Sequence, residues 1–264
     1  MIKRVIFNAD DFNLTTGVNN GIIEAHRFGV VKSTSIMINL QGAEDAVRLL
    51  KKNPNLDVGL HVNLTFGHPV SSTEEVRSLV DDEGKFWRKP SLLFKSAVTE
   101  DLRKEIIAQV ELAQKMGLKL THLDSHHHIH QADKRVSEIF MELALKHHLG
   151  IRSINKEFRS VYRKAGIPTP DNFTDDFYDM QNITIESLEQ ILETMPSGTS
   201  EIMCHPGFSD EELADKSSYE KPRQIEISVL THPRTMQMLQ RVNAKIIGYR
   251  ELLEFFPGYE KSTK

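Results

Sequence analysis

Acidic and imidazole side chains gather at four places in this sequence of 264 residues. Each place follows a short apolar run of the kind that predicts a β-strand. The four groups are Asn8-Ala9-Asp10-Asp11, Gly59-Leu60-His61-Val62-Asn63, His122 through His130, and Met203-Cys204-His205-Pro206-Gly207. A carboxylate and two imidazoles from separate strands are common ligands of a divalent metal ion, and they leave positions open for water and substrate. The sequence therefore predicts a metal site at the ends of several strands.

The third group is the richest, with five imidazoles in nine positions together with Asp124. Side chains alternate between the two faces of a strand. If strand geometry continues beyond Asp124, His126 shares its face and His127 points away. We therefore expect His126 to be a metal ligand, with His128 as the alternative.

Each of the other groups also has a purely structural explanation. Asp10 and Asp11 could form a turn or cap the next helix, although two adjacent carboxylates are costly at a strand end unless a cation neutralises them. A single histidine in an apolar strand, such as His61, is often a hydrogen-bonded core residue. His205 stands before a Pro-Gly pair and could be a turn residue. The joint occurrence of these groups favours function, with His205 as a general acid or base.

Apolar runs alternate with amphipathic stretches along the chain. The runs predict seven strands, at 2–8, 33–38, 56–64, 118–124, 150–154, 200–205 and 244–248. Helices are predicted at 18–28, 43–52, 101–116, 136–147, 185–195 and 234–242. This alternation is typical of an α/β fold with a parallel sheet, either rolled into a barrel or lying open. In both cases the carboxyl ends of the strands face one crevice, where the four groups would meet.

Segments 65–98 and 155–183 interrupt the alternation and are rich in glycine, proline and acidic residues. We expect them to be long loops over the carboxyl-terminal mouth of a barrel. No linker, repeat or low-complexity tract is apparent, so residues 1–264 are expected to form one domain. No Gly-x-Gly-x-x-Gly or Walker sequence follows the first strand, which argues against nucleotide binding.

The composition, 39% hydrophobic and 27% charged, is that of an ordinary globular enzyme. The net charge of -4 arises from 33 basic and 37 acidic residues that are well mixed, so neither nucleic acid nor an anionic membrane is an expected partner. No apolar run approaches the roughly 20 residues that span a bilayer, and the first run is too short for a signal peptide. The single Cys204 suits a reducing compartment, and we expect a cytoplasmic protein.

In this order the four groups resemble the YdjC-type carbohydrate deacetylases, which include the chitooligosaccharide deacetylases and belong to the wider glycoside hydrolase and deacetylase superfamily. The resemblance spans nearly the whole chain. It is carried by NADDFNLTTGVNNGIIEAHRFGVVKSTSIMIN at 8–39, GLHVNLT at 59–65, THLDSHHHIH at 121–130, EIMCHPGF at 201–208 and YEKPRQIEISVLT at 219–231. Short fragments are weak signals, but the ordered set is specific.

The resemblance implies a single irregular (β/α) barrel that removes N-acetyl groups from acetylated sugars, chitooligosaccharides among them, with a divalent metal. Mg²⁺ is the expected ion and Zn²⁺ the alternative. By motif position, the resemblance implies Asp11, His61 and His126 as metal ligands, Asp10 as the base and His205 as the acid. A homodimer is the expected assembly.

General chemistry agrees, because amide hydrolysis needs a nucleophilic water, a positive centre for the developing oxyanion and a proton for the departing amine. Asp124 would orient a ligand imidazole through its other ring nitrogen. Two other classes stay open: a metal-dependent phosphoesterase or other amidohydrolase with the same site, and a noncatalytic sugar-binding protein. Arg223 and Glu226 either form a structural ion pair or touch the substrate.

Overall fold

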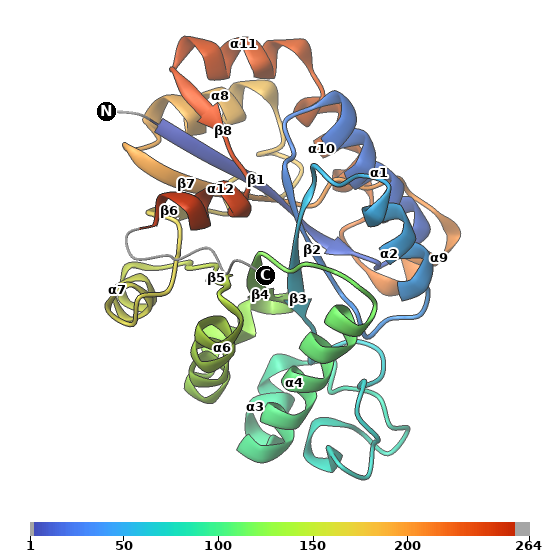
Figure 1. Ribbon diagram of the computed structural model, residues 1–264. Coiled ribbons are helices and arrows are strands. Elements are labelled where there is room, and N and C mark those ends of the chain that lie inside the picture. The colour runs from blue at the N-terminus through green and yellow to red at the C-terminus, as the bar shows by residue number, and fades with distance from the viewer. Residues whose placement is uncertain (1–2, 257–264) are drawn as a thin grey trace.

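The computed structural model describes residues 3–256, and a curled sheet of parallel strands lies at its centre (Figure 1). The strands are β1 (Lys3–Phe12), β2 (Ser33–Ile36), β3 (Asp57–Val62), β4 (His122–Ser125), β5 (Gly150–Ile151), β6 (Asn172–Thr174), β7 (Gly198–Cys204) and β8 (Ala244–Ile246). Their order is β5-β4-β3-β2-β1-β7-β6, and β8 pairs with the first residues of β1. The expected irregular barrel is confirmed, in the form of a half-barrel.

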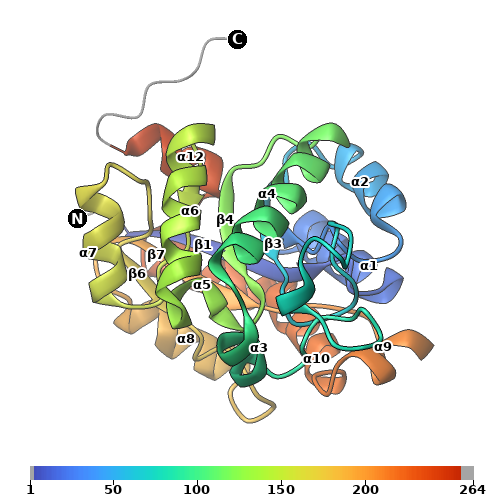
Figure 2. The ribbon, with the colours of Figure 1, turned by 90° about the horizontal axis from the view of Figure 1, so that it is seen from below.

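Helices lie around this sheet (Figures 1 and 2). The longer ones are α1 (Thr16–Phe28), α2 (Ala43–Lys51), α4 (Thr99–Lys115), α6 (Lys134–His147), α7 (Lys156–Lys164), α8 (Ile185–Thr194), α10 (Lys221–Leu230) and α11 (Pro233–Arg241). The shorter helices are α3 (Pro90–Ser96), α5 (Ile129–Ala132), α9 (Glu211–Lys216), α12 (Tyr249–Phe255) and the 3₁₀ helices η1 (Arg77–Leu79) and η2 (His126–His128). All six expected helices and all seven expected strands are present, because each buries an apolar face at its own period.

The two expected loops contain secondary structure that the apolar pattern does not reveal. Segment 65–98 includes η1 and α3, and segment 155–183 includes α7 and β6. Tyr162 is the one residue of α7 that is buried, and with Phe158 beside it the apolar stripe of this helix is short. The three residues of β6 are half-buried at the edge of the sheet, too short a run for alternation to be visible.

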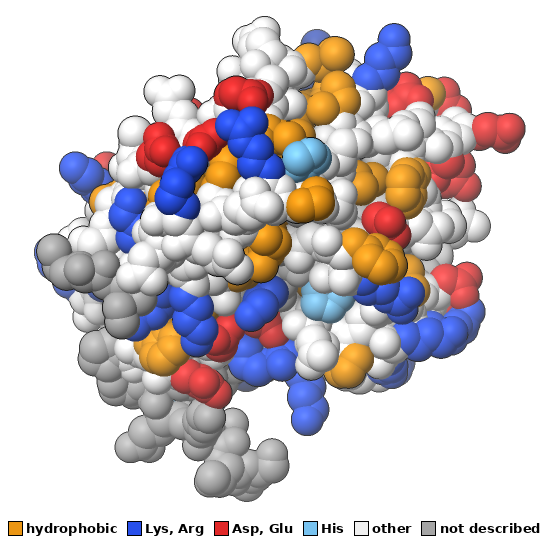
Figure 3. Space-filling model, turned by 90° about the horizontal axis from the view of Figure 1, so that it is seen from above, with side chains coloured by type: hydrophobic (Ala, Val, Ile, Leu, Met, Phe, Trp, Pro, Cys, Tyr) orange, Lys and Arg blue, Asp and Glu red, His pale blue; other side chains and the backbone are white. Residues whose placement is uncertain are grey.

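The surface shows no preference for one sign of charge on the face seen in Figure 3. Lys and Arg side chains are interspersed there with Asp and Glu, and hydrophobic side chains form small groups. Within residues 3–256, none of the helices has the length and apolar character needed to span a bilayer.

The inside of the half-barrel is unusually polar below the strand ends. His122 of β4 is buried between Gly59 of β3 and Tyr249 of α12. The His122 ring stacks on the Tyr249 ring, with centroids 3.7 Å apart. Burial lowers the pKa of His122 to about 3, so the ring is neutral. The Tyr249 hydroxyl donates to Oε2 of Glu201 on β7 at 2.7 Å, which joins α12 to the opposite side of the sheet.

Gly59 is required by this packing, because a Cβ atom there would lie 2.3 Å from Cε1 of His122. We expect Gly59→Ala to lower the free energy of unfolding by about 1–3 kcal/mol through overpacking. In a His122→Ala background the space is free, so the same substitution should cost much less. Denaturant unfolding of the two single variants and the double variant measures this coupling. Additive losses would show that His122 is not what Gly59 accommodates.

Candidate active site

The chain leaves regular strand geometry where β1 reaches Asp10 and Asp11. The pairing of β1 with β2 shifts register between Ala9 and Phe12, and Asp11 has a φ of 67°, in the left-handed region. In an uninterrupted strand the two carboxylates would point to opposite faces. The bulge brings both to the wall of one cavity. Neither caps the next helix, because the side chain of Thr15 accepts the capping hydrogen bond from the backbone of Val18.

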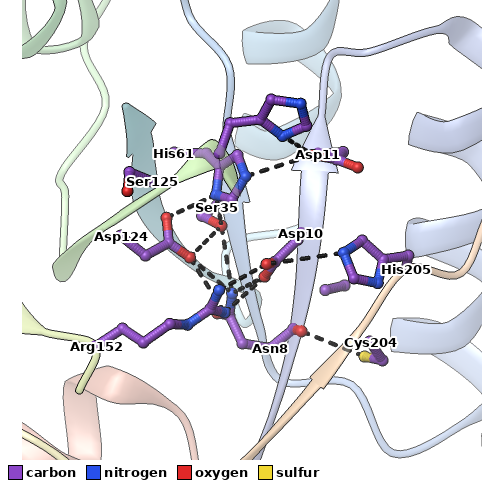
Figure 4. A network of polar contacts seen from close by, with 12 residues as sticks. Asn8, Asp10, Asp11, Ser35, His61, Asp124, Ser125, Arg152, Cys204 and His205 are labelled. Carbon is purple, nitrogen blue, oxygen red and sulfur yellow. Dashed lines mark hydrogen bonds and ion pairs between the residues drawn. The ribbon is translucent and has the colours of Figure 1, made fainter. Parts of the chain in front are cut away.

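Asp11, His61 and His126 come together at this cavity. Figure 4 shows the side chains of Asp11 and His61 directed toward each other. Oδ1 of Asp11 lies 3.4 Å from Nε2 of His61 and 3.3 Å from Nδ1 of His126, yet it is buried without a hydrogen-bond partner. Burial opposes ionisation of Asp11, but Arg223 and the two imidazoles outweigh it and hold its pKa well below the usual value. An unpartnered carboxylate oxygen facing two imidazole nitrogens suits a divalent cation. The three side chains form a cluster that could hold a metal ion.

Asp124 binds the ring nitrogen of His61 that does not face Asp11, as expected for the residue that orients a ligand imidazole. Nδ1 of His61 donates to Oδ1 of Asp124 at 2.8 Å, which leaves Nε2 directed toward Asp11. Burial opposes protonation of His61, but Asp124, Asp11 and Asp10 outweigh it and raise its pKa to about 10. The surroundings of this ring therefore favour a positive charge, which either a proton or a cation can supply.

Arg152, directly after β5, is fully buried and binds carboxylates from three strands. Its Nη1 and Nη2 donate to the two oxygens of Asp10, at 2.6 Å each. Nη2 also lies 3.1 Å from Oδ2 of Asp124, and Nε donates to Oε1 of Glu201 at 2.9 Å. Burial raises the pKa of Asp10, but Arg152 outweighs it and keeps the carboxyl ionised. A second grouping, Asp10 with His61 and Asp124, also approaches metal-binding distances, but Arg152 already occupies its carboxylates.

His205 follows β7, and its Nε2 lies 4.0 Å from Oδ2 of Asp10 (Figure 4). Its ring is edge-on to those of Tyr178 and Tyr219, with centroids 5.6 and 5.5 Å away. Burial lowers the pKa of His205 to about 4, although the nearby Asp11 and Asp10 oppose this shift, so the ring is neutral at pH 7. The preceding Cys204 is not a partner of this ring, because its thiol donates to the backbone carbonyl of Asn8.

The expected continuation of strand geometry beyond Asp124 is wrong. β4 ends at Ser125, and His127 and His128 have φ angles of 56° and 52°. His126 reaches Asp11 by this turn, not by alternation along a strand. His127 does not point away either: like His128, it lines the cavity. Among the described residues, His128 belongs to neither group that could hold a metal.

Arg223 and Glu226 do not pair with each other in the described contacts. Nη2 of Arg223 donates to Oδ2 of Asp11 at 2.6 Å, and Nε donates to the carbonyl of Tyr219 at 2.8 Å. Glu226 instead accepts from the backbone N–H of His205 and from the hydroxyl of Tyr219. The two residues thus tie α10 to the ends of β1 and β7 by separate contacts.

A cavity of about 470 Å³ is lined by many of these side chains, namely Asp10, Asp11, His61, His126, His205 and Arg223. Both interrupting segments reach it as expected, the first with Phe66 and Arg88 and the second with Asp175 and Tyr178. The Tyr178 ring stacks on that of Tyr219, with centroids 4.4 Å apart and planes within 5°. The cavity therefore combines charged groups at the strand ends with an aromatic wall.

The sequence patterns assigned no site role to Arg152, and they left Arg223 as either a structural ion-pair partner of Glu226 or a contact to the substrate. Arg152 follows a strand of only two residues, and no motif marks it. The one available signal is indirect, since buried adjacent carboxylates require cations that the chain must supply.

Comparison with known proteins supports a relationship over the whole fold. A family model described as "YdjC-like protein" matches residues 4–241. The carbohydrate deacetylases of Thermoanaerobacter pseudethanolicus and Brevibacillus brevis are 39% and 40% identical to this chain. Each match covers 94% of this chain and 98% or 99% of the relative.

A solved structure from Enterococcus faecalis, described as a cellobiose-phosphate cleavage protein, superposes with a TM-score of 0.90 and 33% identity, covering 96% of this chain and 99% of that one. The Xyl-CE4 domain of a termite-hindgut xylanase shares only the fold, with a TM-score of 0.52 and 8% identity over 96% of this chain and 91% of that domain. From the family match and these full-length relatives, the chain belongs to the YdjC-like family.

Proposed function

We propose that this protein hydrolyses the N-acetyl groups of sugars, chitooligosaccharides among them, in a metal-dependent reaction. One observation carries the proposal. An unpartnered oxygen of Asp11 faces two imidazoles, and the ionised carboxylate of Asp10 stands beside it. A noncatalytic sugar-binding protein has no need of that second carboxylate. The names of the full-length relatives, carbohydrate deacetylases, agree with this chemistry.

Asp11, His61 and His126 would hold the divalent cation, with Mg²⁺ as the proposed ion and Zn²⁺ as the alternative. When bound, the ion supplies a Lewis acid that lowers the pKa of water and polarises a carbonyl group. Asp124 keeps Nε2 of His61 free for this role by accepting from Nδ1.

Asp10 would remove the proton from the attacking water. Arg152 keeps it ionised and fixes both of its oxygens, so the base is ready before substrate arrives. His205 would protonate the departing nitrogen. Its pKa of about 4 makes it neutral at rest and, once protonated, a stronger acid than an ordinary imidazolium. Because Nε2 lies 4.0 Å from Oδ2 of Asp10, the proton taken from water has a short route to this ring.

The stacked pair of Tyr178 and Tyr219 would bind the sugar ring, because an aromatic face packs well against the apolar face of a pyranose while charged groups contact its polar substituents. The deciding experiment is release of acetate from diacetylchitobiose and from its phosphate ester, with and without added Mg²⁺ or Zn²⁺. Release that a chelator abolishes supports the proposal. Hydrolysis of phosphate esters without any acetate release would favour a phosphoesterase instead.

We expect Asp11→Asn, His61→Ala and His126→Ala each to lower both bound metal and activity, the latter by about 100-fold or more, because each removes a proposed ligand. Metal content after dialysis and acetate release measure the two effects. His128→Asn is the matched control, since asparagine tolerates the left-handed backbone at this position. Metal loss in the control together with full metal in His126→Ala would make His128 the ligand.

Asp10→Asn tests the base. We expect it to keep its metal and fold while the turnover rate falls by about 100-fold or more, the range for a positioned base. Metal content, thermal unfolding and turnover at saturating sugar measure this. Loss of metal from Asp10→Asn would place Asp10 among the ligands and remove it from the role of base.

His205→Ala tests the acid. The loss of turnover should be large for an N-acetyl sugar and small for an aryl acetate, because an aryl oxide leaves without protonation whereas an amine does not. Turnover of both substrates by the same preparation gives the comparison. Equal losses would mean that His205 holds the substrate or shapes the site and donates no proton.

A further inference from the structure

Arg223 has a buried hydrogen-bond donor without a partner. The residue is 2% exposed and lines the cavity, and its Nη1 makes no hydrogen bond. Its Nε and Nη2 are held by the carbonyl of Tyr219 and by Oδ2 of Asp11, so the plane of the guanidinium is fixed. Leaving a charged donor buried and unsatisfied is costly. The free Nη1 therefore suits an acceptor that a bound molecule brings into the cavity.

The place of Nη1 limits which acceptor this is. Nη1 and Nη2 are bonded to the same carbon, so Nη1 lies beside Asp11, whose other oxygen faces His61 and His126. The proposed base and acid, Asp10 and His205, border the same cavity. A donor among these groups is next to the reacting atoms, not at the far end of a substrate.

We propose that Arg223 is a further catalytic residue, which binds the carbonyl oxygen of the scissile N-acetyl group through Nη1; this rests on the proposed function. When the water oxygen bonds to the carbonyl carbon, Asp10 takes the proton and one electron pair of the C=O bond moves to the oxygen. Arg223 stabilises that negative charge. The pair returns as the C–N bond breaks, and the nitrogen takes the proton that Asp10 has passed to His205, which leaves His205 neutral and Asp10 ionised again. A donor aimed at such an oxygen typically contributes 10²–10³ in kcat.

A merely structural role would act through Asp11. In that case Arg223→Ala would weaken metal binding, and saturating metal would restore kcat. A contact with a remote sugar hydroxyl would instead raise KM with little change in kcat. The proposal predicts a third pattern, in which kcat falls about 10²–10³-fold at saturating metal and sugar while KM changes little.

The experiment compares wild type, Arg223→Ala and Arg103→Ala. Arg103 lies on α4 and pairs with Glu142 of α6, so this control removes a guanidinium that does not line the cavity. Turnover of diacetylchitobiose is measured at saturating metal, with and without millimolar guanidinium chloride. Guanidinium should restore part of the kcat of Arg223→Ala and should not raise that of the other two proteins. Restored kcat at high metal, or a change confined to KM, would overturn the proposal.

Acetate binding supplies a readout that needs no turnover. Calorimetry with metal-loaded protein should show acetate binding at least about tenfold weaker in Arg223→Ala than in wild type, because a charge-assisted hydrogen bond to a carboxylate oxygen is lost. Equal affinities would overturn the role of Arg223. If this difference is found but wild type releases no acetate from any sugar, the oxygen-binding role stands and the proposed function fails.

Discussion

Burying several carboxylates beside one another requires a cation, and inside this half-barrel Arg152 is that cation. It binds Asp10 of β1, Asp124 of β4 and Glu201 of β7, which are far apart in sequence. Burial alone would neutralise these acids, as it does in part at Glu201, whose pKa rises to about 7. Arg152 keeps Asp10 ionised, and His61 together with Arg152 keeps Asp124 ionised, so that the first is suited to the proposed role of base and the second can orient His61. The chemistry proposed at the strand ends thus depends on the buried side chain of Arg152.

The same site requires two departures from regular backbone geometry. A straight β1 would turn Asp10 and Asp11 to opposite faces, and a straight continuation of β4 would carry His126 away along the strand direction. A left-handed residue at Asp11 forms a bulge within β1, and left-handed residues at His127 and His128 follow the end of β4 at Ser125. Asparagine, aspartate and histidine occur in this region more often than most residues other than glycine, but two successive residues there are unusual. Such strain persists only where the surrounding contacts hold it.

Apolar periodicity was sufficient to predict a parallel α/β sheet and the strand ends that carry Asp10, Asp11, His61 and His205, whereas the barrel form followed from the family resemblance. The pattern of spacing could not predict the backbone at His126, because parity assumes a strand that in fact stops at Ser125. It also could not show Arg152, whose role depends on three strands meeting around it. The apolar pattern also did not reveal α7 or β6, because α7 buries a single residue and β6 is only three residues long. What sequence patterns omit here is long-range charge pairing and short elements at the edge of the sheet.

Counting lone pairs explains why two adjacent carboxylates can do different work. Each carboxylate oxygen accepts about two hydrogen bonds. Oδ1 of Asp10 already accepts two hydrogen bonds, one from Arg152 and one from the side-chain amide of Asn8. Oδ2 accepts one, from Arg152, so about one lone pair remains free on Oδ2, the oxygen that lies 4.0 Å from Nε2 of His205. One lone pair is enough for one proton. In Asp11, Arg223 donates a hydrogen bond to Oδ2 only. Oδ1 keeps both of its lone pairs and faces two imidazole nitrogens, which is an arrangement that suits a cation. The role proposed for each carboxylate thus depends on the arginine that binds it.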